Sequence, residues 1–233
     1  MIKFFRHIRK RLLKENKTGK YLQYAIGEIV LVVIGILIAL SINNWNEERL
    51  IRKSELNFYR NTKQRLLDDA DNIAAELRFN NKYTEQYKYA IKLIETKNKG
   101  KKDTLGKIAV NLIGYSDFDG QGNIHETMVN SGNIKLLRNE RIKGNLRRLE
   151  ETYFYMNRME AIHFEAVMSF FPEVSQITHL RTGQVENEDS LYGFAFENLF
   201  VLALKLTSEK DEVYNRILNE IESIVQLIDA EVK

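Results

Sequence analysis

The sequence predicts an all-α protein with an N-terminal amphipathic helix, one transmembrane helix that continues into a long helix, and an extracytoplasmic up-and-down helical bundle. Three observations support this prediction. A long apolar segment near the N-terminus carries a single ionisable residue, later apolar residues recur at steps of three and four, and no stretch shows the strict alternation that strands require. Four or five such helices are expected to pack as the bundle.

The first twenty residues are basic and predict a cytoplasmic helix lying on the membrane surface. They hold eight basic residues and one acidic residue, a net charge of +7, whereas the remainder holds 27 basic and 31 acidic residues. Apolar residues recur at helical spacing between the charges, as in helices that lie on anionic headgroups. The residues expected to bind that surface are Lys3, Arg6, Arg9, Lys10, Arg11 and Lys14. Docking of a cytoplasmic partner or nucleic acid is the weaker alternative, and we expect no nucleic-acid partner.

Residues 21–45 are predicted to cross a membrane. Tyr21 to Ile42 would measure about 33 Å as a helix, against a hydrocarbon core of about 30 Å. Eleven of the fourteen residues from Ile29 to Ile42 are Ile, Leu or Val. They favour insertion by about 3 to 7 kcal/mol, more than the roughly 3 kcal/mol that one buried carboxyl costs. Tyr21, Tyr24 and Trp45 suit the two membrane interfaces.

The charge asymmetry predicts the topology. Clustered Lys and Arg beside a span stay in the cytoplasm, which places residues 46–233 outside, in the periplasm of a bacterium with two membranes. A cleaved signal peptide is the competing interpretation, with Ala39-Leu40-Ser41 as its cleavage site. We favour an uncleaved anchor in the inner membrane, because the apolar segment exceeds the 7–15 residues of a signal peptide.

One face of the predicted span carries Glu28, Gly35 and Ala39 at helical spacing. Gly35 and Ala39 form a small-xxx-small pair, which allows another helix to approach closely. A carboxyl on that face is better satisfied by a partner than by lipid. These residues therefore predict self-association or docking of another membrane protein. The alternative is an acid that reaches toward the cytoplasmic headgroups.

Residues 46–98 contain no Gly or Pro and predict one long helix. Nine of twelve positions at alternating steps of three and four are apolar or Tyr, which is typical of a bundle seam: Leu56, Tyr59, Leu66, Ala70, Ile73, Leu77, Tyr87, Ile91 and Ile94. Further helices are expected over residues 104–115, 124–130, about 134–171 and about 191–206, and from Ser208 as an N-cap. Pro172 is expected to end or kink the helix over about 134–171. The apolar side of that helix is marked by Leu136, Leu137, Ile142, Leu146, Leu149, Tyr153, Met156, Met159, Ile162 and Phe164.

The loop from residue 117 to 124 resembles the start of an EF-hand. Asp117, Asp119 and Gln121 stand where calcium ligands would, but Met128 occupies the position of the bidentate Glu. These three residues are a weak metal candidate, and a polar turn is the preferred interpretation. We expect no metal and no cofactor.

Glu160 and His163 have the Glu-x-x-His spacing of di-iron bundles, but no second copy of that motif is present. His163 is therefore expected to lie on a bundle face. The sequence has no cysteine, no Gly-x-Ser-x-Gly motif and no phosphate loop, so no enzyme is predicted. The aromatic-rich set Tyr153, Phe154, Tyr155, Met156, Phe164, Phe170 and Phe171 is expected to form core, with a pocket as the alternative.

The opening residues, with YAIGEIVLVVIGILIAL and INNWNE, resemble the signature of a family of short bacterial single-span membrane proteins classed as a domain of unknown function. The block ETMVNSGNIKLLRNERIKGNLRRLEETY is similar to a looser pattern of that family. The resemblance implies a bacterial inner-membrane protein, with Glu28 inside the GEIVLVVIG string, and implies no activity, cofactor or partner.

Taken together, these features predict a non-enzymatic protein with a structural or interaction role. It would assemble through its span and long helix as a homo-oligomer or with another membrane protein. The alternative is an extracytoplasmic sensor or ligand-binding bundle. Such a sensor would need a partner for its output, because only about twenty residues are expected in the cytoplasm.

Overall fold

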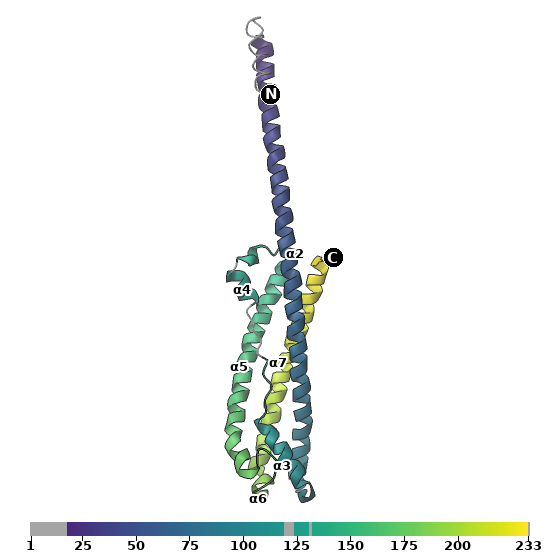
Figure 1. Cartoon of the computed structure of the whole chain (residues 1–233), viewed down its shortest axis with the longest axis vertical. Coiled ribbons are helices and arrows are strands. Elements are labelled where there is room, and N and C mark those ends of the chain that lie inside the picture. The colour runs from purple at the N-terminus through teal and green to yellow at the C-terminus, as the bar shows by residue number, and fades with distance from the viewer. Residues whose placement is uncertain (1–17, 119–123, 131, 233) are drawn as a thin grey trace. The chain divides into compact units, whose positions relative to one another are not determined.

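The computed structural model describes residues 18–118, 124–130 and 132–232, and it confirms an all-α fold. Within those ranges there is no strand, and the β contact found there is an isolated bridge between Thr178 and Val185. The helices are α2 (Thr18–Glu95), α3 (Lys102–Val110), α4 (Ile124–Asn130), α5 (Glu140–Ile177), α6 (Glu188–Leu191) and α7 (Phe194–Val232), as labelled in Figure 1. Short 3₁₀ turns cover Lys99–Lys101, Asn111–Ile113 and Asn133–Lys135. The chain divides into two compact units, Met1–Ser54 and Glu55–Lys233.

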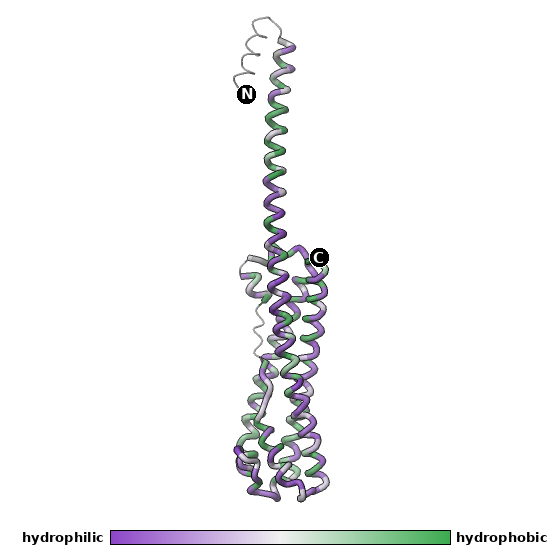
Figure 2. Tube along the Cα trace, turned by 45° about the vertical axis from the view of Figure 1, so that its right-hand side comes forward, coloured by the Kyte–Doolittle hydropathy of each residue, from purple (hydrophilic) through white to green (hydrophobic). Residues whose placement is uncertain are grey.

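The first unit, where described, is the N-terminal part of α2. Its apolar window, green in Figure 2, is long enough to cross a membrane, and none of that window is buried. The helix passes through Ser41 without a break, so the cleavage site considered above would lie in the middle of a helix. The predicted surface helix, with Lys3, Arg6, Arg9, Lys10, Arg11 and Lys14, lies outside the described residues.

The second unit is built on three long helices, α5, α7 and the C-terminal part of α2, drawn together in Figure 1. Two contacts give the direction of α7 relative to α2. Lys63 pairs with Asp229 at 2.5 Å, and the amide of Asn80 donates to Asp211 at 2.6 Å. A later position in α2 therefore meets an earlier position in α7, and the two helices run antiparallel.

In contrast, α5 runs parallel to α2. The carboxylate of Glu55 accepts from the backbone N–H of Arg138 at 2.6 Å, and Asp69 accepts from the hydroxyl of Tyr153 at 2.8 Å. The offset between paired residues stays nearly constant, as parallel helices require. The chain must therefore return along the bundle between α3 and α5. Among its described residues that return includes the short α4 and no long helix, which is why the described bundle has three long helices instead of four or five.

Three predicted boundaries are corrected by the structure. The helix α5 begins at Glu140, where the Asn139 side chain accepts from two backbone N–H groups, and it continues past Pro172 to Ile177. Pro172 is tolerated because its side chain is exposed while Phe170 and Val174 anchor the surrounding turns in the core. Likewise α7 is one helix through Ser208, because the packing of a continuous buried seam outweighs the capping preference of one serine.

The burial of side chains along α2 confirms the predicted seam. The positions at intervals of seven, Tyr59, Leu66, Ile73, Asn80, Tyr87 and Ile94, are all buried. In α5 the apolar side holds as far as Met156, but Ile162 and Phe164 are exposed, and Glu160 and His163 are buried instead. The core consists of two apolar clusters, one around Tyr59–Ile73 and one around Tyr87–Ile94.

We predict that Pro172→Ala increases the stability of the protein. Alanine restores the backbone N–H missing at residue 172, and a proline in a helix interior costs roughly 3 kcal/mol. Urea unfolding of the full chain in mild detergent, followed by circular dichroism, should show a gain of about 1–3 kcal/mol in the free energy of unfolding. Glu173→Ala, at the exposed neighbouring position, is the control and should change it by less than about 0.5 kcal/mol. A loss of stability in Pro172→Ala would contradict this account.

Candidate functional site

A polar layer separates the two apolar clusters of the bundle. The heptad seams of all three long helices are interrupted at this level, by Asn80 in α2, by Glu160 and His163 in α5, and by Lys210 in α7. Each of these side chains is buried, Lys210 completely. Because a buried charge is costly unless it is paired and hydrogen-bonded, four polar residues at one level need specific partners.

Lys210 is the centre of the layer. Its Nζ donates to the carbonyl oxygen of Ser116 at 2.6 Å and lies 2.8 Å from Nδ1 of His163. It also lies 6.0 Å from the centre of the Tyr214 ring. Burial lowers the pKa of Lys210 to about 8, against the opposing effect of nearby carboxylates of Glu160, Asp211, Glu76 and Asp117. The ammonium form is therefore stabilised by two hydrogen-bond acceptors and by the charges of nearby carboxylates.

His163 is kept neutral by this arrangement. Burial and then the charge of Lys210 lower its pKa to about 4. An ammonium group has only donors, so Nδ1 of His163 accepts from Lys210 and the ring proton lies on Nε2. This confirms His163 as a bundle-face histidine. Among the described residues, no group of three or more His, Asp or Glu side chains could hold a metal ion.

Glu160 joins α5 to α7 and to the crossing segment at residues 114–118. Its Oε1 accepts from the hydroxyl of Tyr214 at 2.6 Å and from the backbone N–H of Phe118 at 2.7 Å. Burial raises the pKa of Glu160, and these two hydrogen bonds oppose that effect. Burial together with the bond to Glu160 also raises the pKa of Tyr214. The carboxyl group is thus held in place through one of its two oxygens.

Carboxylates also lie on the side of the layer formed by α2 and α7. Asp211 accepts from Asn80, and burial raises its pKa. Burial likewise raises the pKa of Glu76, while Lys210 and the backbone N–H of Asp117 lower it. The segment at residues 114–118 therefore contacts α2, α5 and α7, through Glu76, Glu160 and Lys210.

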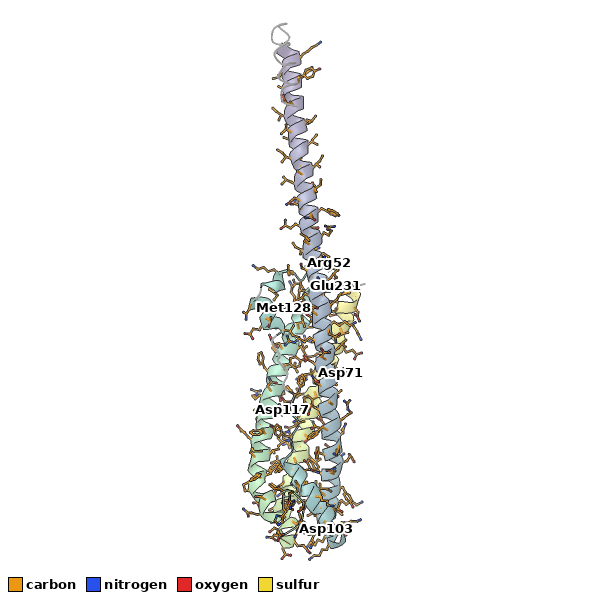
Figure 3. All side chains as sticks on the ribbon, in the orientation of Figure 1. Arg52, Asp71, Asp103, Asp117, Met128 and Glu231 are labelled. Atoms are coloured by element: carbon orange, nitrogen blue, oxygen red, sulfur yellow. The ribbon has the colours of Figure 1, made fainter. Side chains whose placement is uncertain are left out.

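A pocket of about 370 Å³ opens from this layer to solvent. It is lined by Tyr115, Asp117, Asn157, Glu160, Ala161 and Phe164. The rings of Tyr115 and Phe164 meet edge to face with 5.2 Å between their centres. Figure 3 shows Asp117 beside α5, about midway along the bundle. Two aromatic rings and two carboxyl groups thus face one space.

The residues predicted for metal binding are only partly described. Asp117 is exposed at the pocket, whereas Asp119 and Gln121 lie outside the described residues. Met128, at the position where an EF-hand has its bidentate Glu, is 1% exposed and packs in the core. That side chain therefore faces the interior of the bundle and not a ligand loop.

The residues predicted for association through the span lie in the first unit. Glu28 is half-buried, and Ala39 is exposed. A Cβ added to Gly35 would meet no described atom within 4 Å, so no contact among the described residues explains a glycine there.

Sequence reasoning missed Lys210 and the layer around it. The signal is positional: Lys210 stands seven residues after Ala203 and seven before Ile217, both buried. Asn80 occupies the same kind of position between Ile73 and Tyr87. The expectation that the aromatic set forms core is confirmed for only part of it, and it is wrong for three residues that are exposed and do not line the pocket. Tyr153, Met156 and Phe170 are core, Phe164 lines the pocket, and Phe154, Tyr155 and Phe171 are exposed.

A family model described as "Family of unknown function (DUF6090)" matches residues 28–165, more than half of the chain. The match begins at Glu28 and includes Glu160 and His163. No curated protein and no solved structure matches the chain.

We predict that acidification destabilises the bundle through His163. Its pKa is about 4 in the folded protein and about 6.5 in the unfolded chain, so below pH 6.5 the unfolded chain binds a proton that the folded protein does not. At pH 5 this linkage costs about 2 kcal/mol relative to pH 7. His163→Asn keeps an acceptor for Lys210. Between pH 7 and pH 5 its free energy of unfolding, measured by urea unfolding of the full chain, should fall by about 2 kcal/mol less than that of wild type. The exposed His179→Asn should behave as wild type; equal pH dependence in all three proteins would refute the assignment.

Proposed function

The chain belongs to DUF6090, a family of unknown function, and from its own residues we propose that it is a non-enzymatic, single-pass membrane protein that acts by assembly. In this proposal the apolar N-terminal part of α2 crosses the bacterial inner membrane. The basic N-terminal segment remains in the cytoplasm, and the bundle of residues 55–233 lies in the periplasm. The absence of the common catalytic motifs from the sequence supports a non-enzymatic role.

The exposure of the apolar side chains in α2 supports the membrane assignment. Large apolar residues from Leu22 to Ile42 are between 47% and 64% exposed, and such a continuous surface is unfavourable in water. A hydrocarbon environment removes that cost, and an unbroken helix satisfies its backbone groups internally.

Association through the face of Glu28, Gly35 and Ala39 is supported by the conformational cost of Gly35. A glycine inside a helix costs about 1 kcal/mol relative to alanine. No atom of the described residues occupies the space beside Gly35, and close approach of a second helix would explain the glycine. Homo-oligomerisation is the primary proposal, and docking of another membrane protein is its variant.

A second candidate function, ligand binding by the bundle with signalling through a partner, is supported by a different observation. Glu160 of the polar layer is buried, and it also lines a pocket. An apolar core of equal volume is often as stable or more so, so the burial of Lys210, Glu160 and His163 is best explained by a role beyond stability, and ligand binding at the adjoining pocket is one such role.

We predict that the chain resists carbonate extraction from membranes and has its N-terminus inside. The sequence has no cysteine, so single cysteines can be introduced without background. In intact spheroplasts a membrane-impermeant maleimide should label Lys101→Cys, and it should label Lys14→Cys only after lysis, because the positive residues remain inside. Labelling in the opposite order, or release of the chain by carbonate, would overturn the membrane proposal.

We predict that bulky residues on the Gly35 face weaken self-association. Gly35→Leu and Glu28→Leu should each raise the dissociation constant in mild detergent about tenfold or more, since helix packing and interhelical hydrogen bonds contribute about 1–2 kcal/mol each. Sedimentation equilibrium of the full chain measures this change. Ser41→Leu is the matched control, because it enlarges a small residue on another face of the same helix. A wild-type monomer, or equal effects from all three substitutions, would refute self-association through this face.

A further inference from the structure

We propose that the pocket formed by Tyr115, Asp117, Asn157, Glu160, Ala161 and Phe164 binds a small organic ammonium ion. The pocket lies wholly within residues 55–233, so this proposal is independent of how the span associates. Its volume of about 370 Å³ is at the small end of the range for ligand sites, which suits an amine of a few heavy atoms.

One wall of the pocket is formed by two aromatic rings. Tyr115 and Phe164 meet at 5.2 Å with an interplanar angle of 67°, so their rings form a corner and not a flat stack. Phe164 is 41% exposed although it is large and apolar. The negative faces of such rings attract a cation by about 0.5–2 kcal/mol.

Two carboxyl groups also line the pocket. Glu160 is 5% exposed, and its Oε1 is fully used by Tyr214 and the backbone of Phe118. No described residue donates to Oε2, the second oxygen of a group that lines the pocket. Asp117 adds a second carboxyl at the mouth. A ligand that carries positive charge is the complement of this wall.

The charges around the pocket also favour a cation over an anion. Among the described residues, no Lys or Arg lines the pocket. Lys210, whose charge acts on Glu160 from inside the bundle, directs its Nζ to Ser116 and His163 and does not line the pocket. The described residues offer no metal site, and the carboxyl groups stand beside aromatic rings, so an organic ammonium ion fits better than a metal ion.

The test is calorimetric titration of the full chain in mild detergent with two pairs of probes. Choline is paired with 3,3-dimethylbutan-1-ol, which has the same shape without the charge, and propylammonium is paired with 1-propanol. At least one ammonium probe should bind at one site per chain, and its neutral counterpart should bind about tenfold more weakly or not at all. Binding of choline alone would identify a fully methylated ammonium, and binding of propylammonium alone an N–H donor.

Variants locate the site. Glu160→Gln keeps an oxygen that can accept from Tyr214 and Phe118, so the fold should persist, and it should weaken binding about tenfold or more. Phe164→Leu should weaken binding about two- to fivefold, as expected for loss of one cation–π contact. Phe154→Leu is the matched control, because this exposed phenylalanine of α5 does not line the pocket, and it should bind as wild type. Circular dichroism of each variant verifies that the bundle is intact.

Two results would overturn the proposal. The first is that neither ammonium probe binds more tightly than its neutral counterpart. The second is that folded Glu160→Gln binds the ammonium probe as tightly as wild type does. Failure of the span to associate would leave both measurements unaffected, so the two proposals fail separately.

Discussion

The bundle depends on satisfying the ammonium group of one fully buried lysine. Lys210 stands at a seam position of α7 where the residues seven before and seven after it are apolar. Desolvation lowers its pKa to about 8, so at neutral pH the charge remains and must be compensated. A buried charge left unpaired costs several kcal/mol, more than any single apolar contact contributes. The surroundings of Lys210 are therefore more tightly constrained than the apolar layers on either side.

This constraint determines the register of the bundle. Lys210 requires His163 of α5 and the carbonyl of Ser116, and Glu160, one turn from His163, receives the Tyr214 hydroxyl. Sliding α5 against α7 by one turn would break these contacts together, whereas Ile and Leu side chains could repack after such a shift. The polar layer thus contributes specificity to a fold whose apolar seams alone allow several alignments.

The same layer explains why an irregular segment crosses the bundle. The return between the parallel helices α2 and α5 brings residues 114–118 over the level of Lys210, where the segment supplies the Ser116 carbonyl and the Phe118 N–H. These backbone groups would be unsatisfied in an apolar core, and here they complete the coordination of Lys210 and Glu160. Tyr115 and Asp117, next to the buried Ser116, are then presented to the pocket beside α5.

The sequence by itself determined the helical class, the apolar segment of α2 and the seam of α2 after it, because these depend on periodicity and on the transfer of apolar side chains out of water. It also identified α4 to the residue, and His163 as a bundle-face residue. It could not reveal that Pro172 and Ser208 lie inside helices, because packing on both sides outweighs local preference there. The polar layer was decided by tertiary structure alone: Asn80, the pair Glu160 and His163, and Lys210 lie on three helices that are far apart in the chain. Only the alignment of three helices places these residues at one level. There the cost of burying a charge without a partner is offset because the polar side chains contact one another and nearby backbone groups.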